Sequence, residues 1–75
     1  MPKATSHPLL QKVGKRVRTI RAKAGISQEA LADAAGLDRS YMSGVERGVR
    51  NLSVLKLAAI AEALGVPASS LLRDE

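Results

Sequence analysis

Apolar side chains recur along the first third of the chain in steps of three and four residues, the spacing of one face of an α-helix. The residues of this stripe are Leu9, Leu10, Val13, Val17, Ile20 and Ala24. They predict a helix of about four turns that is capped by Ser6 or His7, has Pro8 near its first turn and ends at Gly25. Gly14 lies inside this helix and weakens it by about 1 kcal/mol relative to alanine.

Three shorter helices are predicted next. Each begins after a residue of a type that caps helix N-termini and ends at a glycine. These pairs are Ser27 and Gly36, Asp38 and Gly48, and Ser53 and Gly65. Pro67 then opens a short fifth helix over about residues 68–72. No strand pattern is convincing, so we predict a compact all-α domain of five helices over residues 7–75, preceded by a flexible tail of residues 1–6.

The second and third predicted helices are joined by the tight turn Gly36-Leu37-Asp38. A turn this short sets its two helices at a steep angle, and glycine supplies the positive φ that such a turn needs. The side chains spaced to pack inside the corner are Leu31, Ala35, Leu37, Met42 and Val45. This is the arrangement that a helix-turn-helix requires.

The fourth predicted helix carries two apolar lines. Its expected inward face consists of Val54, Leu57, Ala58, Ala61 and Leu64, with Ile60 close by. A second line contains Leu52, Leu55, Ala59 and Ala63. A monomer gains nothing from an exposed leucine, so we expect a dimer interface formed by Leu52, Leu55, Ala59, Leu71 and Leu72. The alternative is that the fifth helix folds back and covers this surface.

Composition excludes several classes of protein. The 75 residues fit one small domain with a marginal core, which also favours self-association. With no cysteine and one histidine, neither a disulfide framework nor a zinc site is expected, and we predict no metal and no cofactor. Hydrolytic residues are not arranged for catalysis, so we expect no enzyme and no small-molecule ligand. No long apolar run or signal sequence is present, which indicates a cytoplasmic protein without a membrane partner.

Charge is distributed unevenly along the chain. Residues 1–28 contain seven basic residues and no acidic one, whereas residues 29–75 contain five basic and seven acidic residues, giving a formal net charge of +5. A basic end on a near-neutral body favours a polyanionic partner such as nucleic acid. The alternative is a solvated face that only aids solubility.

The central segment has a familiar pattern. Residues 27–48, SQEALADAAGLDRSYMSGVERG, closely resemble the helix-turn-helix of the Cro and phage-repressor (XRE) family, and residues 49–66 resemble the loop and fourth helix that follow in that family. Residues 39–51 are similar to the small controller proteins of restriction–modification systems. The resemblance spans roughly residues 9–72, and Leu52 departs from it because the family often has proline there.

The resemblance implies that the third helix enters the major groove of DNA and contacts base edges. The matching positions are Arg39, Ser40, Tyr41 and Ser43, with Gly44 permitting close approach. Arg39 stands at the start of this helix, where a guanidinium can donate two hydrogen bonds to guanine.

Other positions are expected to bind the DNA backbone or to hold the fold together. The expected phosphate contacts are Gln28, Arg50, Asn51, Lys15 and Arg16, and the helix N-terminus at Gln28 suits an anion. Arg21 and Glu46 match a family pair that forms a structural, partly buried ion pair. The resemblance therefore implies that neither of these two residues contacts DNA or takes part in catalysis.

These observations together predict a sequence-specific regulator of transcription that binds double-stranded DNA as a homodimer on a pseudo-palindromic operator, in the manner of a controller protein or a phage-type repressor. A two-fold dimer sets its recognition helices about 34–36 Å apart. The alternative is a DNA-binding antitoxin or adaptor that uses the fold to bind another protein. The sequence leaves open the operator, the sign of regulation and contact with RNA polymerase.

Overall fold

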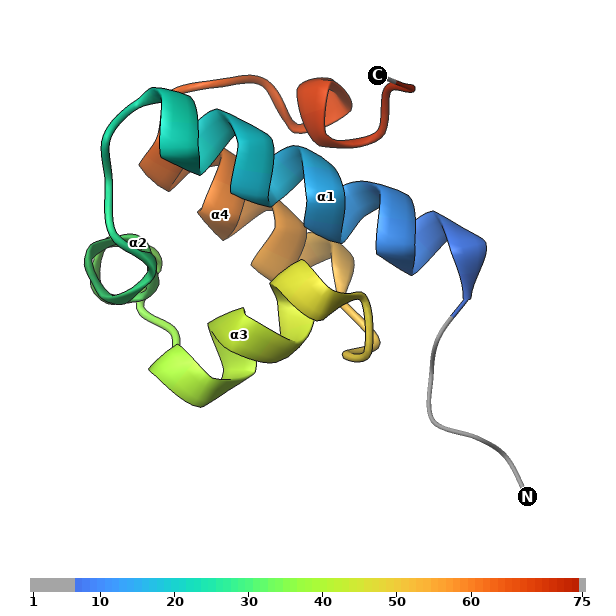
Figure 1. Cartoon of the computed structure of the whole chain (residues 1–75), viewed down its shortest axis with the longest axis horizontal. Coiled ribbons are helices and arrows are strands. Elements are labelled where there is room, and N and C mark those ends of the chain that lie inside the picture. The colour runs from blue at the N-terminus through green and yellow to red at the C-terminus, as the bar shows by residue number, and fades with distance from the viewer. Residues whose placement is uncertain (1–6, 75) are drawn as a thin grey trace.

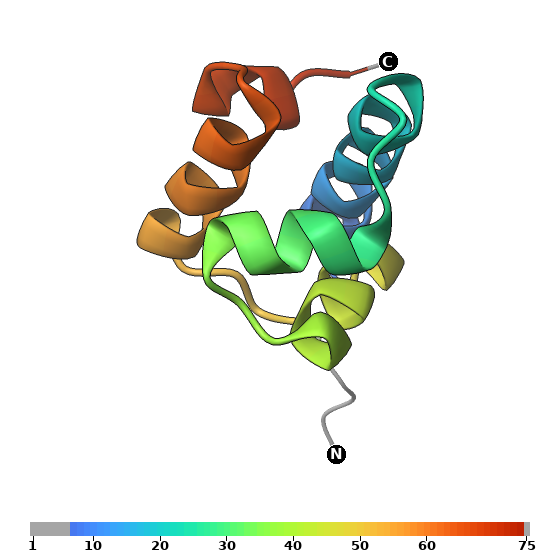
Figure 2. The same ribbon diagram turned by 90° about the vertical axis from the view of Figure 1, so that its left-hand side faces the viewer.

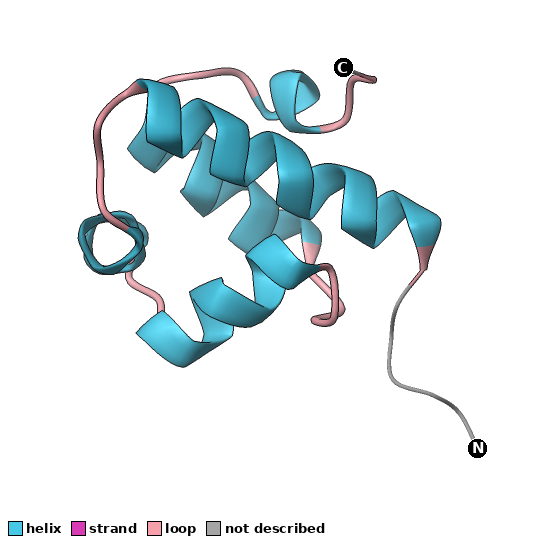
Figure 3. Ribbon diagram, viewed as in Figure 1, coloured by secondary structure: helices cyan, strands magenta, loops and turns pink. Residues whose placement is uncertain are grey.

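The computed structural model describes residues 7–74, so the tail expected at residues 1–6 and the final residue lie outside the described part. The described chain forms four α-helices and one 3₁₀ turn, without a strand (Figures 1 and 3). The elements are α1 (Pro8–Lys23), α2 (Gln28–Ala35), α3 (Arg39–Arg47), α4 (Val54–Leu64) and η1 (Ala68–Leu71).

The fifth predicted α-helix is wrong in type. After Pro67 the chain makes a four-residue 3₁₀ helix, in which the Leu72 N–H donates to the Ser69 carbonyl at 3.1 Å. So short a segment closes too few hydrogen bonds to nucleate an α-helix, and the tighter 3₁₀ turn is the usual outcome.

Local capping sets the ends of the other helices. The His7 imidazole Nδ1 accepts from the Leu9 N–H at 3.0 Å, which identifies His7 as the cap of α1. The Ser27 hydroxyl accepts from the Ala30 N–H at 3.0 Å, and Gly36 ends α2 with a φ of 70°. This left-handed glycine turns the chain into α3, as the corner between two helices requires.

The helices pack around a single small core (Figures 1 and 2). α1 lies against α3, α2 packs between α3 and α4, and η1 contacts both α1 and α4. In both views α3 and η1 lie at opposite ends of the fold. The buried apolar side chains are Val13, Val17, Leu31, Ala32, Met42, Val45, Ile60, Ala61 and Leu71. The predicted inner corner of the helix-turn-helix therefore lies in the core, with Ala35 and Leu37 partly buried against it.

The inward face predicted for α4 is shifted. Ile60 and Ala61 are buried and Leu57 is partly buried, but Val54 is 79% exposed and Ala58 is also exposed. Val54 stands in the first turn of α4, where it borders a surface groove instead of the core.

Two glycines allow α1 and α3 to cross closely. A Cβ on Gly14 would collide with the carbonyl oxygen of Val45 and would lie 2.7 Å from that of Glu46. At Gly48, which has a φ of 75°, a Cβ would lie 2.8 Å from the Gln11 Cα. The glycine that weakens α1 as an isolated helix is thus the residue that lets α3 pack onto it.

Candidate nucleic-acid interface

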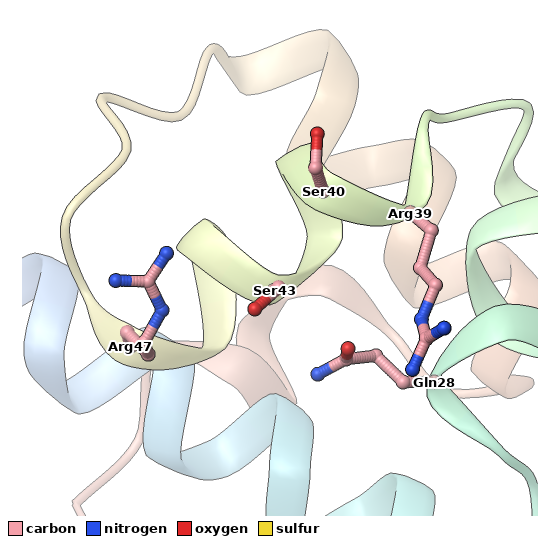
Figure 4. Close-up of a pocket in the computed structure, with 5 residues that line it drawn as sticks. All are labelled: Gln28, Arg39, Ser40, Ser43 and Arg47. Carbon is pink, nitrogen blue, oxygen red and sulfur yellow. The ribbon is translucent and has the colours of Figure 1, made fainter.

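The exposed face of α3 borders a shallow surface pocket at the N-terminal end of α2. Its lining residues are Gln28, Arg39, Ser40, Ser43 and Arg47 (Figure 4). Figure 4 shows the Arg39 side chain extending from the start of α3 toward Gln28, while Arg47 projects at the other end of the helix. The structure therefore gathers three of the expected base-contacting residues beside the expected phosphate-binding glutamine.

The start of α3 is organised by Asp38. One carboxylate oxygen of Asp38 accepts from the Ser40 N–H at 3.2 Å, from the Tyr41 N–H at 3.4 Å and from the Ser40 hydroxyl. The Ser40 hydroxyl and the Tyr41 N–H hold the pKa of the Asp38 carboxyl below its ordinary value. Because Ser40 donates its hydroxyl proton to Asp38, it can offer DNA only acceptor lone pairs until that hydrogen bond is exchanged.

A nearly buried ion pair ties α1 to the end of α3. The Arg21 Nε and Nη2 atoms donate to the two carboxylate oxygens of Glu46 at 2.6 and 3.0 Å, and Arg21 Nη1 donates to the Ile26 carbonyl at 2.9 Å. The Arg21 side chain is 16% exposed and that of Glu46 is 5% exposed. The hydrogen bond with Glu46 raises the pKa of Arg21. This geometry orients both charges inward, away from a ligand.

The same carboxylate holds Gln28. The Gln28 side-chain amide donates one hydrogen bond to the Glu46 Oε1 atom at 3.1 Å. The amide carries a second N–H, and the backbone N–H groups of the first turn of α2 lie beside it. Glu46 therefore orients a side chain at the anion-favouring end of α2.

A second cluster covers the outward side of α3. The Arg50 guanidinium lies 5.5 Å from the centre of the Tyr41 ring, and the Lys56 ammonium lies 5.6 Å from it. Arg50 comes from the loop between α3 and α4, and its side chain lies across Gly44. Asn51, the next residue of this loop, is exposed. Gly44, expected to permit close approach to DNA, has the Arg50 side chain lying over it in the free protein.

The basic residues expected on α1 point in different directions. Arg16 Nε donates to the Ser70 carbonyl at 2.9 Å, and Lys12 forms an ion pair with Asp74 at 2.7 Å. Both contacts hold the C-terminal segment, at the end of the fold opposite α3, so Arg16 does not belong to the candidate interface (Figure 1). Lys15 is exposed on α1.

Two cations of the site were missed by sequence reasoning. Arg47 lines the pocket with Arg39, and Lys56 lies over Tyr41. Residues 39, 43 and 47 follow each other at steps of four, so helical spacing alone places Arg47 on the base-contacting face. Lys56 lacks such a signal, because its approach to Tyr41 depends on where the fold places α4 relative to α3.

An apolar groove lies apart from this surface. It is lined by Leu9, Leu10, Val13, Leu52, Val54, Leu57 and Leu72. Leu72, which lines the groove, is 43% exposed. Leu55, which follows the lining residue Val54 in the sequence, is 81% exposed. The expectation for Leu71 needs correction, because this side chain is 0% exposed and belongs to the core. Ala59 is partly buried.

Within residues 7–74 no three potential metal-ligating side chains lie together. None of the helices described has the length and apolar character needed to cross a membrane.

Comparison with known proteins gives consistent matches. A family model described as HTH_3, helix-turn-helix, matches residues 17–71. Control protein C.BamHI of Bacillus amyloliquefaciens is 47% identical over 60 residues, which cover 79% of this chain and 74% of that protein. The immunity repressor protein of Bacillus phage phi105 is 40% identical over 63 residues, and this chain spans 44% of its length.

Solved structures show the same fold. The restriction–modification controller protein C.AhdI of Aeromonas hydrophila is 48% identical and superimposes with a TM-score of 0.81, covering 83% of this chain and 94% of that one. The master regulator for biofilm formation SinR, whose structure is a complex with DNA, is 34% identical with a TM-score of 0.77, covering 81% of this chain and 98% of that one.

Proposed function

Because the chain belongs to the HTH_3 family of helix-turn-helix, DNA-binding transcriptional regulators, we propose that it binds one specific double-stranded operator as a homodimer. The observation that carries this proposal is the exposed face of α3, where Arg39, Ser43 and Arg47 stand beside the N-terminal end of α2. A face of this kind fits the major groove, in which side chains of a recognition helix contact base edges.

The residues divide into two groups by their chemistry. Arg39, Ser40, Tyr41 and Ser43 contact bases, and Arg39 donates two hydrogen bonds to a guanine. Gln28 with the first turn of α2, together with Asn51 and the cations Lys15, Arg47 and Arg50, contacts phosphates and sets the position of the protein on the duplex. Phosphate contacts give affinity on any sequence, whereas base contacts give the preference for one operator.

The second copy in this proposal docks at the apolar groove. Large exposed apolar side chains gather there, since Leu9, Val54 and Leu72 line the groove and Leu55 lies next to it in the sequence. A two-fold axis through this patch covers it on both protomers at once. The two α3 helices then face the same side of the duplex, and the operator is a pseudo-palindrome.

Such a dimer, in the cytoplasm with its DNA, controls transcription by where it binds. An operator that overlaps a promoter excludes RNA polymerase, and one beside the promoter permits contact with it. The similarity to proteins named as restriction–modification controllers supports a role in controlling gene expression through the occupancy of the operator, which rises with protein concentration.

The test is selection of binding sites from a random duplex library, followed by titration of the selected site against scrambled DNA at two salt concentrations. The proposal expects a palindromic site bound far more tightly than scrambled DNA, and relaxed preference at one G·C pair in Arg39→Ala. Weak binding that is equal on all sequences and comes only from salt-sensitive charge attraction overturns the proposal and favours a protein-binding role.

A further inference from the structure

We infer that Gly44 is a positioning residue for specificity: by lacking a side chain it seats the loop residue Arg50 on α3, against Tyr41, so that Arg50 contacts bases. This inference rests on the proposed function, because it names a further determinant of the same DNA-binding surface. It also replaces the phosphate contact that the proposed function, following the sequence, gives to Arg50 with a contact to bases.

The seat is defined by distances at Gly44. A Cβ built there would lie 2.6 Å from the Arg50 Cγ, 3.1 Å from its Nε and 3.4 Å from its Cδ. The atoms that would be displaced are therefore those of one side chain that runs across the helix. Gly44 is buried, and the Arg50 side chain is what lies nearest to its free position.

The backbone gives no other reason for glycine at this position. The described glycines with positive φ are Gly25, Gly36, Gly48 and Gly65, and Gly44 is not among them. Gly44 has ordinary helical geometry inside α3, where alanine is the better helix former. Gly14 is also helical, but its missing side chain makes room for backbone of α3. At Gly44 the three atoms nearest to such a side chain all belong to Arg50, and none is backbone.

Tyr41 fixes the far end of the arginine. Tyr41 stands three residues before Gly44, one turn nearer the start of α3, and its ring lies 5.5 Å from the Arg50 guanidinium. The arginine therefore runs along the helix toward the turn that also holds Arg39. The attraction between guanidinium and ring keeps this direction, and Lys56 lies at a similar distance from the ring.

A guanidinium held in this way has a different use from one on a free loop. A mobile arginine can neutralise any nearby phosphate, and this contact is the same for every base sequence. A guanidinium of fixed position and plane on the groove-facing helix can match the O6 and N7 atoms of one guanine. Seating by Gly44 thus converts a loop cation into a second base-contacting arginine.

The test combines Gly44→Ala with Arg50→Ala and the double variant, each measured on the selected operator and on all its single-base-pair changes. Gly44→Ala is expected to unfold at the same or a higher temperature than the parent protein. It should lose about five- to 150-fold in affinity for each half-site of the operator, the discrimination of one bidentate arginine, with preference flattened at the same base pair as in Arg50→Ala. Adding Gly44→Ala to Arg50→Ala should cost nothing further.

Arg47→Ala provides the matched control, because it removes another exposed cation of the same helix. Its effect should add to that of Gly44→Ala, since the two act separately. Additive losses for Gly44→Ala and Arg50→Ala, or an unchanged base preference in a stably folded Gly44→Ala, overturn the inference while leaving the proposed function in place. Absence of any preference in the parent protein overturns both.

A measurement on the free protein tests the seat without DNA. The Arg50 side-chain protons near the Tyr41 ring should show ring-current shifts in NMR spectra of the parent protein and lose them in Gly44→Ala. Unchanged Arg50 shifts between the two proteins contradict the seating by Gly44, whatever the result on DNA.

Discussion

Gly14 of α1 approaches Glu46 of α3 so closely that a Cβ on the glycine would lie 2.7 Å from the glutamate carbonyl oxygen. The atoms in the way are backbone, which cannot swing aside as a flexible side chain does. This contact sets the distance between the first helix and the helix that carries the candidate interface.

Gly14→Ala should therefore destabilise the protein, although alanine favours the helix. Overpacking of this kind costs about 1–3 kcal/mol, against a gain in helix propensity of about 1 kcal/mol. Urea unfolding followed by circular dichroism measures the difference. Gly44→Ala is the matched control, because the three atoms nearest to its new methyl group belong to the Arg50 side chain and not to backbone, and it should keep its stability. A Gly14→Ala protein as stable as the parent contradicts the tight crossing.

Arg21→Met should cost about 2–4 kcal/mol of unfolding free energy, because it strands the Glu46 carboxylate with 5% of its side chain exposed. The double variant Arg21→Met with Glu46→Leu removes both charges and should regain most of the loss. A double-mutant cycle by chemical unfolding measures the coupling, and additive losses in the two single variants argue against a direct pair. Because the pKa of Arg21 is raised, alkaline pH removes this contribution only as pH rises through that raised pKa, well above neutral pH.

Acid should weaken the start of α3. The pKa of Asp38 is lower in the folded protein than its ordinary value of about 3.9, because Ser40 and Tyr41 donate to the carboxylate. Its contribution to stability is therefore complete above that value and is lost as pH falls below it toward the folded pKa. Asp38→Asn keeps a capping oxygen without the titrating charge, so its thermal stability should fall less steeply in acid. If the thermal stabilities of the parent protein and Asp38→Asn fall in parallel between neutral pH and strong acid, the charge of Asp38 does not stabilise the start of α3.

Leu55→Glu should shift the protein toward monomer in analytical ultracentrifugation, with no loss of monomer stability, because the leucine is 81% exposed. Operator binding should weaken and become more dependent on protein concentration. Ala22→Glu places the same charge at an exposed position of α1 and should leave the association unchanged. A dimer that tolerates Leu55→Glu places the interface elsewhere.

Arg47→Ala should weaken binding almost equally on all sequences and reduce the slope of log affinity against log salt by about two, because the dimer loses one phosphate contact in each protomer. Arg39→Ala, at the opposite end of α3, should instead change the base preference. Titrations at a series of salt concentrations separate the two roles. If Arg47→Ala alters preference at one base pair and leaves the slope unchanged, Arg47 contacts a base.

What the sequence predicted well is local in origin. Helix ends follow from neighbours such as Ser27 and Gly36, whose capping needs only residues within four positions. The buried corner follows from the helical spacing of residues such as Leu31 and Met42. These features depend on short stretches of chain, so periodicity and capping rules suffice.

What the sequence did not predict depends on contacts between distant residues. Arg16 was assigned to phosphate on charge, yet it donates to the carbonyl of Ser70, 54 positions away. Val54 was assigned to the core on periodicity, yet no helix covers the first turn of α4 at that point. The seat of Arg50 on Gly44 likewise follows from the path of the loop, which no short-range rule specifies.

The cluster at Tyr41 has an optical consequence. The chain has one tyrosine and neither tryptophan nor phenylalanine, so all its intrinsic ultraviolet fluorescence comes from the side chain that lies beside Arg50 and Lys56. Tyr41 is partly buried and packs against the core, so its emission reports both on the cation cluster over α3 and on the packing beneath it. Tyrosine fluorescence therefore follows DNA binding at the candidate interface without a label, and the backbone circular dichroism of the same sample shows whether a change in emission comes from unfolding instead.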